Sequence, residues 1–516
     1  MRPTYLGFEV QKRTLQLAQK NIDIVGNNIS NINTPGYTRQ RVDLYSEYVS
    51  VNSSFRWASP NSNLSMQGQG VNAYGVSQIR DIYIDRRYRE NVAIEAEADK
   101  DVGILSDIED VLDNFETDGL QYFTQQFFNS LQDYSMEKPD SSEVATIVVN
   151  TATNLCRLLN DYDKQLREVE MTYVNELTDT VSHINNLTEQ MNVLNQRIEK
   201  EKTHFNEEYG PNELYDELNM YIDELATYGN IEVTENSNGT YSVKMGNVEL
   251  VDGEKFKTNR ILMKDYDIYN QAILFFESGE ELNLASGQLK GYYDMINGNG
   301  VYATGHQNGN YGIAYFKTAI DEFARTLADV FNKANGGFED ESRRMFKSEP
   351  EGSLVTAGNI HVSDEWLQDP TMIGQVRKLD PVTGQYQYGY DEKQDEVNGT
   401  VTLQNTNVIY LISQLENSNI EFGNSHDFQG SFYEYISFIS NRLGQTIQYQ
   451  TSRYDTAEVT VDGLLDARDE VSAPSMDEEG INMMNYQKWY SASSRLVTTL
   501  DELLDKLING TGRVGL

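Results

Sequence analysis

Residues 27–41 read Asn-Asn-Ile-Ser-Asn-Ile-Asn-Thr-Pro-Gly-Tyr-Thr-Arg-Gln-Arg, and they end a run of apolar residues spaced by three and four. This spacing predicts one apolar stripe along an N-terminal helix, of the kind that packs lengthwise against a second helix. Thr34-Pro35-Gly36-Tyr37 then suits a type II turn, with proline at the second position and glycine where φ must be positive. The stripe consists of Phe8, Leu15, Ala18, Ile22, Val25, Ile29 and Ile32, with Gln11 as its one polar position.

The last forty residues carry a second stripe with the same alternating spacing. A parallel set at every seventh residue, which begins at Met483 and continues through Tyr490, Val497 and Leu504, makes this stripe wider. We expect the two ends of the chain to pair, because each stripe needs an apolar partner; the alternative is two unrelated surface helices on one core. The C-terminal stripe consists of Tyr486, Trp489, Ser493, Leu496, Leu500, Leu503 and Leu507.

Both ends resemble a known family. The stretch 27–40 closely resembles the N-terminal signature of the bacterial flagellar rod, hook and hook-associated proteins, through Asn27, Asn28, Asn31, Thr34, Gly36 and Tyr37. Asp477-Glu478-Glu479 and residues 485–492 resemble the matching C-terminal signature. In that family the two ends pair as coiled helices and form the inner wall of an axial tube. The resemblance therefore implies an assembly interface made of Leu15, Ala18, Ile22, Val25, Ile29, Ile32, Tyr486, Trp489, Leu496, Leu500, Leu503 and Leu507.

Composition excludes several classes of protein. The formal net charge is −39, which leaves no basic surface to neutralise phosphates, so we expect no nucleic-acid partner. No stretch reaches the apolar length of a membrane span, and the N-terminus lacks the apolar segment of a secretory signal peptide. We therefore expect no membrane insertion, and if the protein is exported, it leaves the cell by another route. The single cysteine, Cys156, is expected to be a buried apolar residue.

The body of the chain reads as a long helical rod. Residues 140–209 contain neither glycine nor proline, and a helix over 155–199 would be about 67 Å long at 1.5 Å per residue. The segment 107–132 supplies helices to pack against it. Residues 231–234 and 240–243 alternate around an Asn-Gly turn and predict a small β unit.

The predicted fold class is mainly α with β insertions, in an elongated multidomain axial protein. We expect residues 1–45 and 475–516 to form the terminal coiled-coil domain. Residues 46–230, 287–336 and 401–474 form the helical rod, with a strand-rich region at 46–80. Residues 231–286 form the small β unit, and residues 337–400 form an inserted, outward-facing β-rich domain.

No catalytic constellation is found in the sequence. The five histidines are far apart, and metalloprotease, nucleotide-binding and nucleophile-elbow motifs are absent. The carboxylates of Asp477, Glu478 and Glu479 are best explained as complementing the dipole at a helix start. We expect no catalytic, cofactor-binding or metal-binding residues, no cofactor, and no enzymatic activity.

Segments in the middle of the chain, such as 210–217 and 432–439, resemble the family members at the junction between hook and filament. The resemblance implies a structural protein of the flagellum that polymerises at this junction, is secreted, and contacts itself, the hook protein and a second junction protein. It also implies a cytoplasmic export chaperone at the C-terminal helix. The alternatives are a hook or rod protein of the same family, or a hydrolase carried on the flagellum.

Overall fold

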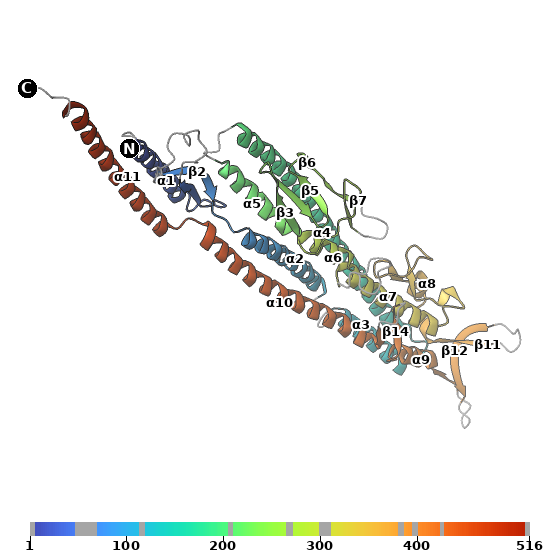
Figure 1. Cartoon of the computed structure of the whole chain (residues 1–516). Coiled ribbons are helices and arrows are strands. Elements are labelled where there is room, and N and C mark those ends of the chain that lie inside the picture. The colour runs from blue at the N-terminus through green and yellow to red at the C-terminus, as the bar shows by residue number, and fades with distance from the viewer. Residues whose placement is uncertain are drawn as a thin grey trace, which may run out of the picture.

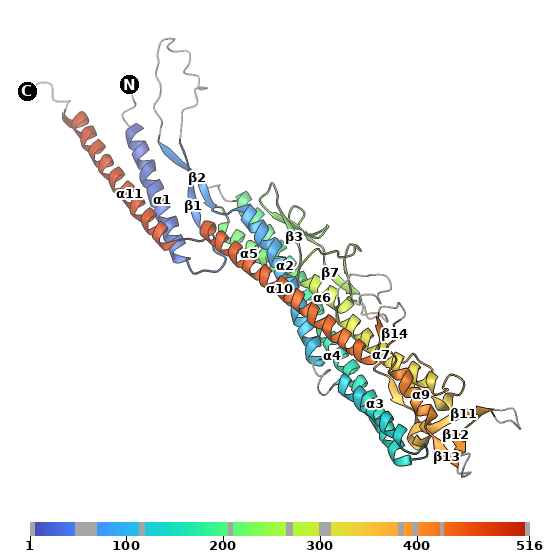
Figure 2. The ribbon, with the colours of Figure 1, turned by 90° about the horizontal axis from the view of Figure 1, so that it is seen from below.

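The protein is an elongated assembly of helices with small antiparallel sheets along one side, as the computed structural model shows (Figure 1). The structure describes residues 6–46, 70–112, 119–204, 210–264, 272–298, 311–379, 386–394, 401–423 and 428–510. Helix α1 (Leu6–Ser30) begins, and helix α11 (Met476–Asp505) ends, at the same end of the molecule (Figure 2). The mainly helical fold with β insertions is confirmed.

The terminal helices α1 and α11 lie side by side and antiparallel at that end (Figure 2). A short π-helical turn, Lys506–Gly510, continues α11. A two-stranded ribbon of β1 (Gln40–Ser46) and β2 (Val71–Gln78) covers the other side of α1. Residues 47–69, which include most of the predicted extended segment, lie outside the described residues.

Five long helices make the rod. They are α2 (Ile82–Leu112), α3 (Leu120–Met136), α4 (Ser142–His204), α5 (Asn212–Tyr228) and α10 (Phe432–Ser472). The stretch without glycine or proline does form one helix, α4, whose 63 residues span about 95 Å at 1.5 Å per residue. Four apolar residues on its inner face, Leu159, Leu166, Ile184 and Ile198, are fully buried in the core of the rod.

The predicted β unit lies on the flank of α4. A four-stranded sheet has the order β3-β4-β5-β6, with strands Ile231–Glu235, Tyr241–Met245, Val248–Asp252 and Lys257–Thr258. Strands β7 (Ile261–Lys264) and β8 (Ile273–Phe276) pair beside it. The turn at Gly239 has a φ of 82°, which accounts for the glycine in the predicted Asn-Gly turn.

The far end of the rod combines helices with short strands. Helices α7 (Ile313–Ala334), α8 (Asp364–Gln368) and α9 (Thr406–Leu415) lie there with two 3₁₀ turns, Glu341–Arg343 and Pro370–Gly374, whereas α6 (Gln288–Asn297) packs on α2 in the middle of the rod. Strands β9 (Phe346–Ser348) and β10 (Ile360–Val362) pair, as do β14 (Ile420–Phe422) and β15 (Phe428–Gly430). Strands β11 (Gln375–Leu379), β12 (Tyr386–Gln394) and β13 (Val401–Gln404) form a three-stranded sheet that projects from the tip (Figure 2).

One continuous apolar core runs through the rod and into this far end. Phe346, Trp366 and Ile373, which belong to the stretch 337–400, are buried in the same core as α4 and α7. The first half of this stretch is therefore packed onto the rod, and its outward part is the β11–β13 sheet. The sequence pattern showed the short strands here but gave no sign that Trp366 packs against Phe331 of α7, with ring centroids 5.9 Å apart.

Candidate assembly interface

The pairing of α1 with α11 uses one half of the predicted C-terminal stripe. Ser493 is buried, Tyr486 and Leu500 are half-buried, and the Leu500 side chain lies next to Gly7 of α1. Of the parallel set at every seventh residue, Met483, Val497 and Leu504 are half-buried as well, whereas Tyr490 is exposed. The contact face of α11 is therefore centred between the predicted stripe and the set beside it.

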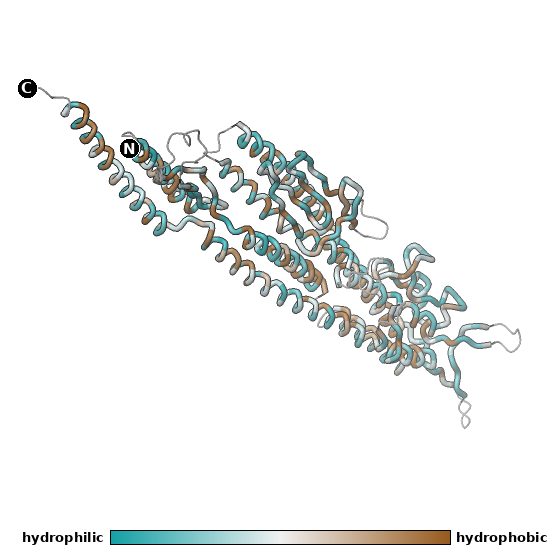
Figure 3. The backbone as a smooth tube through the Cα atoms, in the orientation of Figure 1, coloured by the Kyte–Doolittle hydropathy of each residue, from teal (hydrophilic) through white to brown (hydrophobic). Residues whose placement is uncertain are grey.

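The other half of the stripe faces away from α1. Trp489 and Leu496 are each 50% exposed, Leu503 is 54% exposed and Leu507 is 59% exposed. Pairing with α1 leaves this half uncovered, because a single neighbouring helix covers only an arc of roughly 100° and the apolar positions of α11 span more. Apolar positions, brown in Figure 3, continue along α11 to its C-terminal end.

Helix α1 buries two faces instead of the single one expected. Ala18 and Val25 are buried at 1% and 5% exposure, while Leu15, Ile22, Ile29 and Ile32 of the predicted stripe are half-buried. A second face, made of Leu17 and Ile24, packs on Val42 and Val76 of the β1–β2 ribbon. The seven-residue spacing of Leu17 and Ile24 was the available signal, and reading only the first stripe missed it.

The family-signature residues build the end of α1 and the turn after it. Asn28 is buried, accepts a hydrogen bond from the N–H of Gln40 (3.0 Å) and donates one to the carbonyl of Gln40 (2.9 Å). The Tyr37 hydroxyl also donates to the Asn28 Oδ1 (2.8 Å). Asn31, directly after the helix, donates to Asn27 in its last turn, and the Thr34 hydroxyl donates to Asn31.

The turn itself has the predicted form. The N–H of Tyr37 donates to the carbonyl of Thr34 (3.2 Å), and Gly36 has a φ of 75°. A Cβ at Gly36 would also lie 2.5 Å from the side chain of Met220 on α5, so the glycine serves both the turn and the close approach. This turn lets the chain leave α1 and enter β1 while Tyr37 reaches back to Asn28.

Arg39 joins this turn to the start of α11. Its N–H donates to the carbonyl of Ser472 (2.8 Å), the last residue of α10. Its guanidinium forms ion pairs with Glu478 and Glu479, each at 2.6 Å. Glu479 is only 1% exposed. The acidic triplet at the start of α11 therefore has a partner 440 positions away in sequence, in addition to its place at a helix N-terminus.

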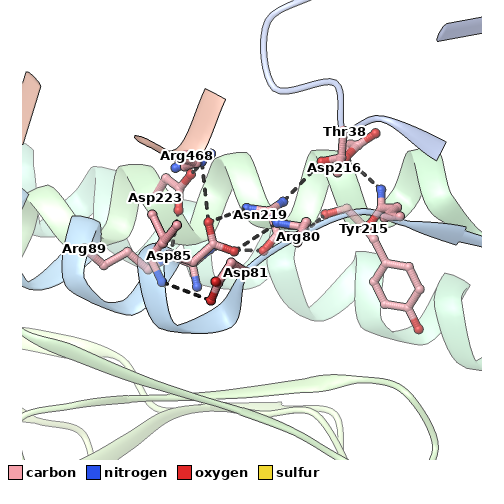
Figure 4. Close-up of polar contacts among 12 residues, drawn as sticks. Thr38, Arg80, Asp81, Asp85, Arg89, Tyr215, Asp216, Asn219, Asp223 and Arg468 are labelled. Atoms are coloured by element: carbon pink, nitrogen blue, oxygen red, sulfur yellow. Dashed lines mark hydrogen bonds and ion pairs between the residues drawn. The ribbon is translucent and has the colours of Figure 1, made fainter. Parts of the chain in front are cut away.

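A charged network anchors the same junction to the rod (Figure 4). Arg80 donates from its Nε and Nη2 to the two carboxylate oxygens of Asp85 (3.0 and 3.1 Å). Arg468 of α10 reaches Asp223 of α5 (2.7 Å) and Asp85 of α2 (3.5 Å), and Arg89 of α2 binds the other oxygen of Asp223 (2.6 Å). Three helices are thus joined by three arginines that share two aspartates.

Asp216 of α5 contacts the segment of the chain that follows the turn. It accepts a hydrogen bond from the Gln78 side chain (2.8 Å), and it also interacts with Thr38. Burial raises the pKa of Asp216 to about 6, although the hydrogen bonds from Thr38 act in the opposite direction. Burial, followed by the charge of Asp216, also raises the pKa of Tyr37.

A cleft of about 350 Å³ lies between the turn and the end of α10. Its walls are the residues 32–38 on one side and Arg468, Asp469 and the linker Ser472–Pro474 on the other. We define the elbow as the junction that contains this turn, the α10–α11 linker and the charged network. The geometry fixes the direction in which α1 and α11 leave the rod.

Within the residues that the structure places, no group of three or more His, Cys, Asp or Glu side chains is arranged to hold a metal ion. Of the helices searched there, none is both long and apolar enough to cross a bilayer. Cys156 is buried, as expected, and burial raises the pKa of its thiol.

Comparison with known proteins agrees with this architecture. Residues 105–339 match the model described as the flagellar hook-associated protein FlgK helical domain. Residues 8–38 match the flagella basal body rod protein model, and residues 469–510 match the C-terminal model of the flagellar basal body rod FlgEFG proteins.

Full-length relatives give the same result. The chain is 27% identical to flagellar hook-associated protein 1 of Bacillus subtilis over 99% of both chains. It is 24% identical to the Salmonella typhimurium protein of that name over 96% of this chain and 98% of the relative. The fold resembles the flagellar hook junction protein FlgK from Burkholderia pseudomallei, with a TM-score of 0.54 and 12% identity, over 75% of this chain and all of that one.

A helical rod whose two chain ends pair beyond an elbow defines the class, the structural axial proteins of the bacterial flagellum. Within this class the chain is similar over its full length to the relatives named flagellar hook-associated protein 1, and its middle part matches the helical domain of those proteins. The expectation of a structural flagellar protein is confirmed.

Proposed function

We propose that this protein polymerises at the junction between hook and filament, and that the exposed half of the α11 stripe carries the contact between neighbouring copies. The observation behind this proposal is that the two sides of α11 differ in how far their apolar side chains are buried. Trp489, Leu496 and Leu503 are each at least half exposed on a helix whose opposite side is packed. Large side chains in a continuous exposed row are typical of a surface that another chain covers.

The predicted interface residues then divide into two groups with different roles. Ala18 and Val25 are already buried inside the chain, and together with the half-buried residues they hold α1 against α11 and the ribbon. The contact between copies uses the exposed group, which consists of Trp489, Leu496, Leu503 and Leu507.

The remaining partners follow from the same assembly. We propose that the hook protein and a second junction protein contact the two axial ends of the polymer, and that the chain reaches this place by secretion through the flagellar export apparatus. A cytoplasmic chaperone covers the C-terminal helix before export. Of the domains proposed from the sequence, the terminal coiled coil is the assembling part. No enzymatic role is proposed.

The test is complementation of a deletion strain with Leu496→Asp and Leu503→Asp. An aspartate in an apolar contact costs several kcal/mol, so we expect hooks without filaments and flagellin lost to the medium. Thr498→Asp is the matched control, because Thr498 is exposed on the same helix outside this group, and it should support filament growth. Normal filaments in the two leucine variants would refute the proposed contact.

A further inference from the structure

The apolar contact between α10 and the rod is extensive in the first half of the helix and thin in the second half. Its first half places Phe432, Tyr435, Ile439 and Leu443 in the main core of the rod. The buried apolar residues of its second half are only Ala457, Val461 and Leu464, and they do not belong to that core. The residues 448–472, which we call the strap, therefore lie on α2 with a thin apolar contact.

Two arginines bind the strap to the rod. Arg453 reaches Glu97 (3.0 Å) and Asp101 (3.6 Å) on α2. Fifteen residues further on, Arg468 reaches Asp85 and Asp223 in the elbow network. These arginines are 28% and 16% exposed, whereas the carboxylates of Glu97 and Asp101 are almost fully buried. The ionic contacts thus occur where the apolar contact is weakest.

The cluster around Arg453 holds more negative than positive groups. The charged groups facing Asp101 are Glu97 on its own helix, Lys290 and Asp294 on α6, and Arg453 on α10. Lys290 binds Glu97 (2.9 Å) and Asp294 (2.6 Å). Three buried carboxylates therefore share two cations, and full ionisation would leave one buried negative charge without a counter-ion.

The excess of buried negative charge coincides with oxygen atoms that lack a hydrogen-bond partner in the part of the chain that the structure describes. Asp101 Oδ1, Glu97 Oε2 and the buried Gln450 Oε1 find no hydrogen-bond partner among the described residues. Burial, with the charge of Glu97 second, raises the pKa of Asp101 to about 8. Asp101 accordingly keeps a proton at neutral pH in the closed arrangement and would lose it once exposed to water.

Like charges also face each other beside this cluster. Burial and the charges of Glu458, Asp462 and Asp99 raise the pKa of Glu95 on α2. Glu458 and Asp462 belong to the strap, so ionised carboxylates of α10 and α2 repel each other across the contact. These like charges weaken the contact along the same helix pair.

We propose that the strap is a releasable segment, which ionisation of Asp101 detaches from α2 while the aromatic first half of α10 stays packed. Because α11 follows the strap after only Ala473, Pro474 and Ser475, release would free α11 to change its angle to the rod. The device would let the terminal helices adapt without disturbing the main core. It does not depend on the proposed place of the protein in the flagellum.

Hydrogen exchange on the isolated full-length chain tests the proposal, with protection factors corrected for the intrinsic pH dependence of exchange. Between pH 6 and pH 9 we expect protection in residues 448–472 to fall by about tenfold or more, because the closed form must give up its proton. Residues 432–447 should keep their protection. Asp101→Asn should remove most of the pH dependence in the strap, and Asp179→Asn, an exposed carboxylate of α4, should leave it unchanged.

A second variant keeps the test decisive if Asp101→Asn folds poorly. Arg453→Gln should lower protection of the strap at both pH values and leave residues 432–447 as they are. Equal loss of protection along the whole of α10 on raising the pH would overturn the proposal. So would an unaltered pH response in well-folded Asp101→Asn.

Discussion

Asn28 holds Gln40 by both of its main-chain groups, at 3.0 Å to the N–H and 2.9 Å to the carbonyl. The Asn28 side chain thereby makes the two main-chain hydrogen bonds with Gln40 that a neighbouring strand would otherwise make. The same device recurs along the molecule, with a helical asparagine bonded to the N–H and carbonyl of one extended residue: Asn185 with Ile261, Asn195 with Tyr241, Asn297 with Ala272, and Asn332 with Phe346.

Asn28→Ala should release the first strand from α1. The substitution leaves the buried N–H and carbonyl of Gln40 and the Tyr37 hydroxyl without their partner, at about 1 to 3 kcal/mol for a buried group left unpaired. We expect hydrogen exchange in residues 40–46 to speed up at least tenfold. Ser30→Ala is the control, because the exposed Ser30 hydroxyl bonds only within the helix, to the carbonyl of Gly26. If both variants exchange like the parent chain, the contact of Asn28 with Gln40 does not stabilise the first strand.

Arg39 and Glu479 should be energetically coupled. Arg39→Gln leaves the buried Glu479 without its cation, which costs about 3 kcal/mol when one partner of a buried pair is removed. Removing both charges in Arg39→Gln with Glu479→Gln should cost less than the two single changes added together, with a coupling of about 1 to 3 kcal/mol. Hydrogen exchange in residues 472–482 measures the local opening. Strictly additive effects would show that the ion pair does not join the turn to α11.

Asp216 predicts a stability that falls as the pH rises through the acid range. Its pKa in the folded chain, about 6, lies above the ordinary value of 3.8, so the folded state binds the proton more tightly than the unfolded state. The resulting stabilisation is complete below pH 4 and is lost as the pH rises to about 6. Asp216→Asn should therefore gain stability relative to the parent chain across this interval, on the order of 1 to 3 kcal/mol, and show no further change above pH 7. Urea unfolding at a series of pH values, followed by a probe in the elbow, measures the difference in stability between Asp216→Asn and the parent chain. A difference that shrinks as the pH rises would contradict the prediction.

The parts of the fold that the sequence predicted are those that depend on local spacing. The long helix α4 follows from seventy residues without a helix breaker, and the turn at Gly36 follows from Pro-Gly chemistry. The two terminal stripes were visible for the same reason. Their division into covered and exposed halves was not visible, because spacing shows that a residue is apolar but not how wide an arc its partner covers.

The elbow was beyond the reach of sequence reasoning. Arg39 and Glu479 are 440 residues apart, and Arg89 meets Asp223 across 134 positions. Nothing in the spacing of charged residues selects these partners among 121 charged side chains. A buried network is defined only once the helices are placed, so the sequence could name the signature asparagines without showing what they bind.

The exposed half of the α11 stripe makes a definite prediction about export. Trp489, Leu496 and Leu503 are accessible while α1 and α11 remain paired, so a chaperone can bind them without opening the terminal helices. An aromatic anchor beside leucines at seven-residue spacing suits recognition of a helix in an apolar groove. Removing residues 480–516 should abolish chaperone binding, and Trp489→Ala should weaken it by tenfold or more, since a central aromatic anchor is worth about 2 kcal/mol.

Removing residues 1–40 should leave chaperone binding intact and stop secretion, while Thr498→Asp serves as the matched control on α11. Pull-down of each variant from cytosol measures binding, and secretion into the medium is followed in parallel. Chaperone retained by the chain that ends at residue 479 would show that the binding surface lies elsewhere.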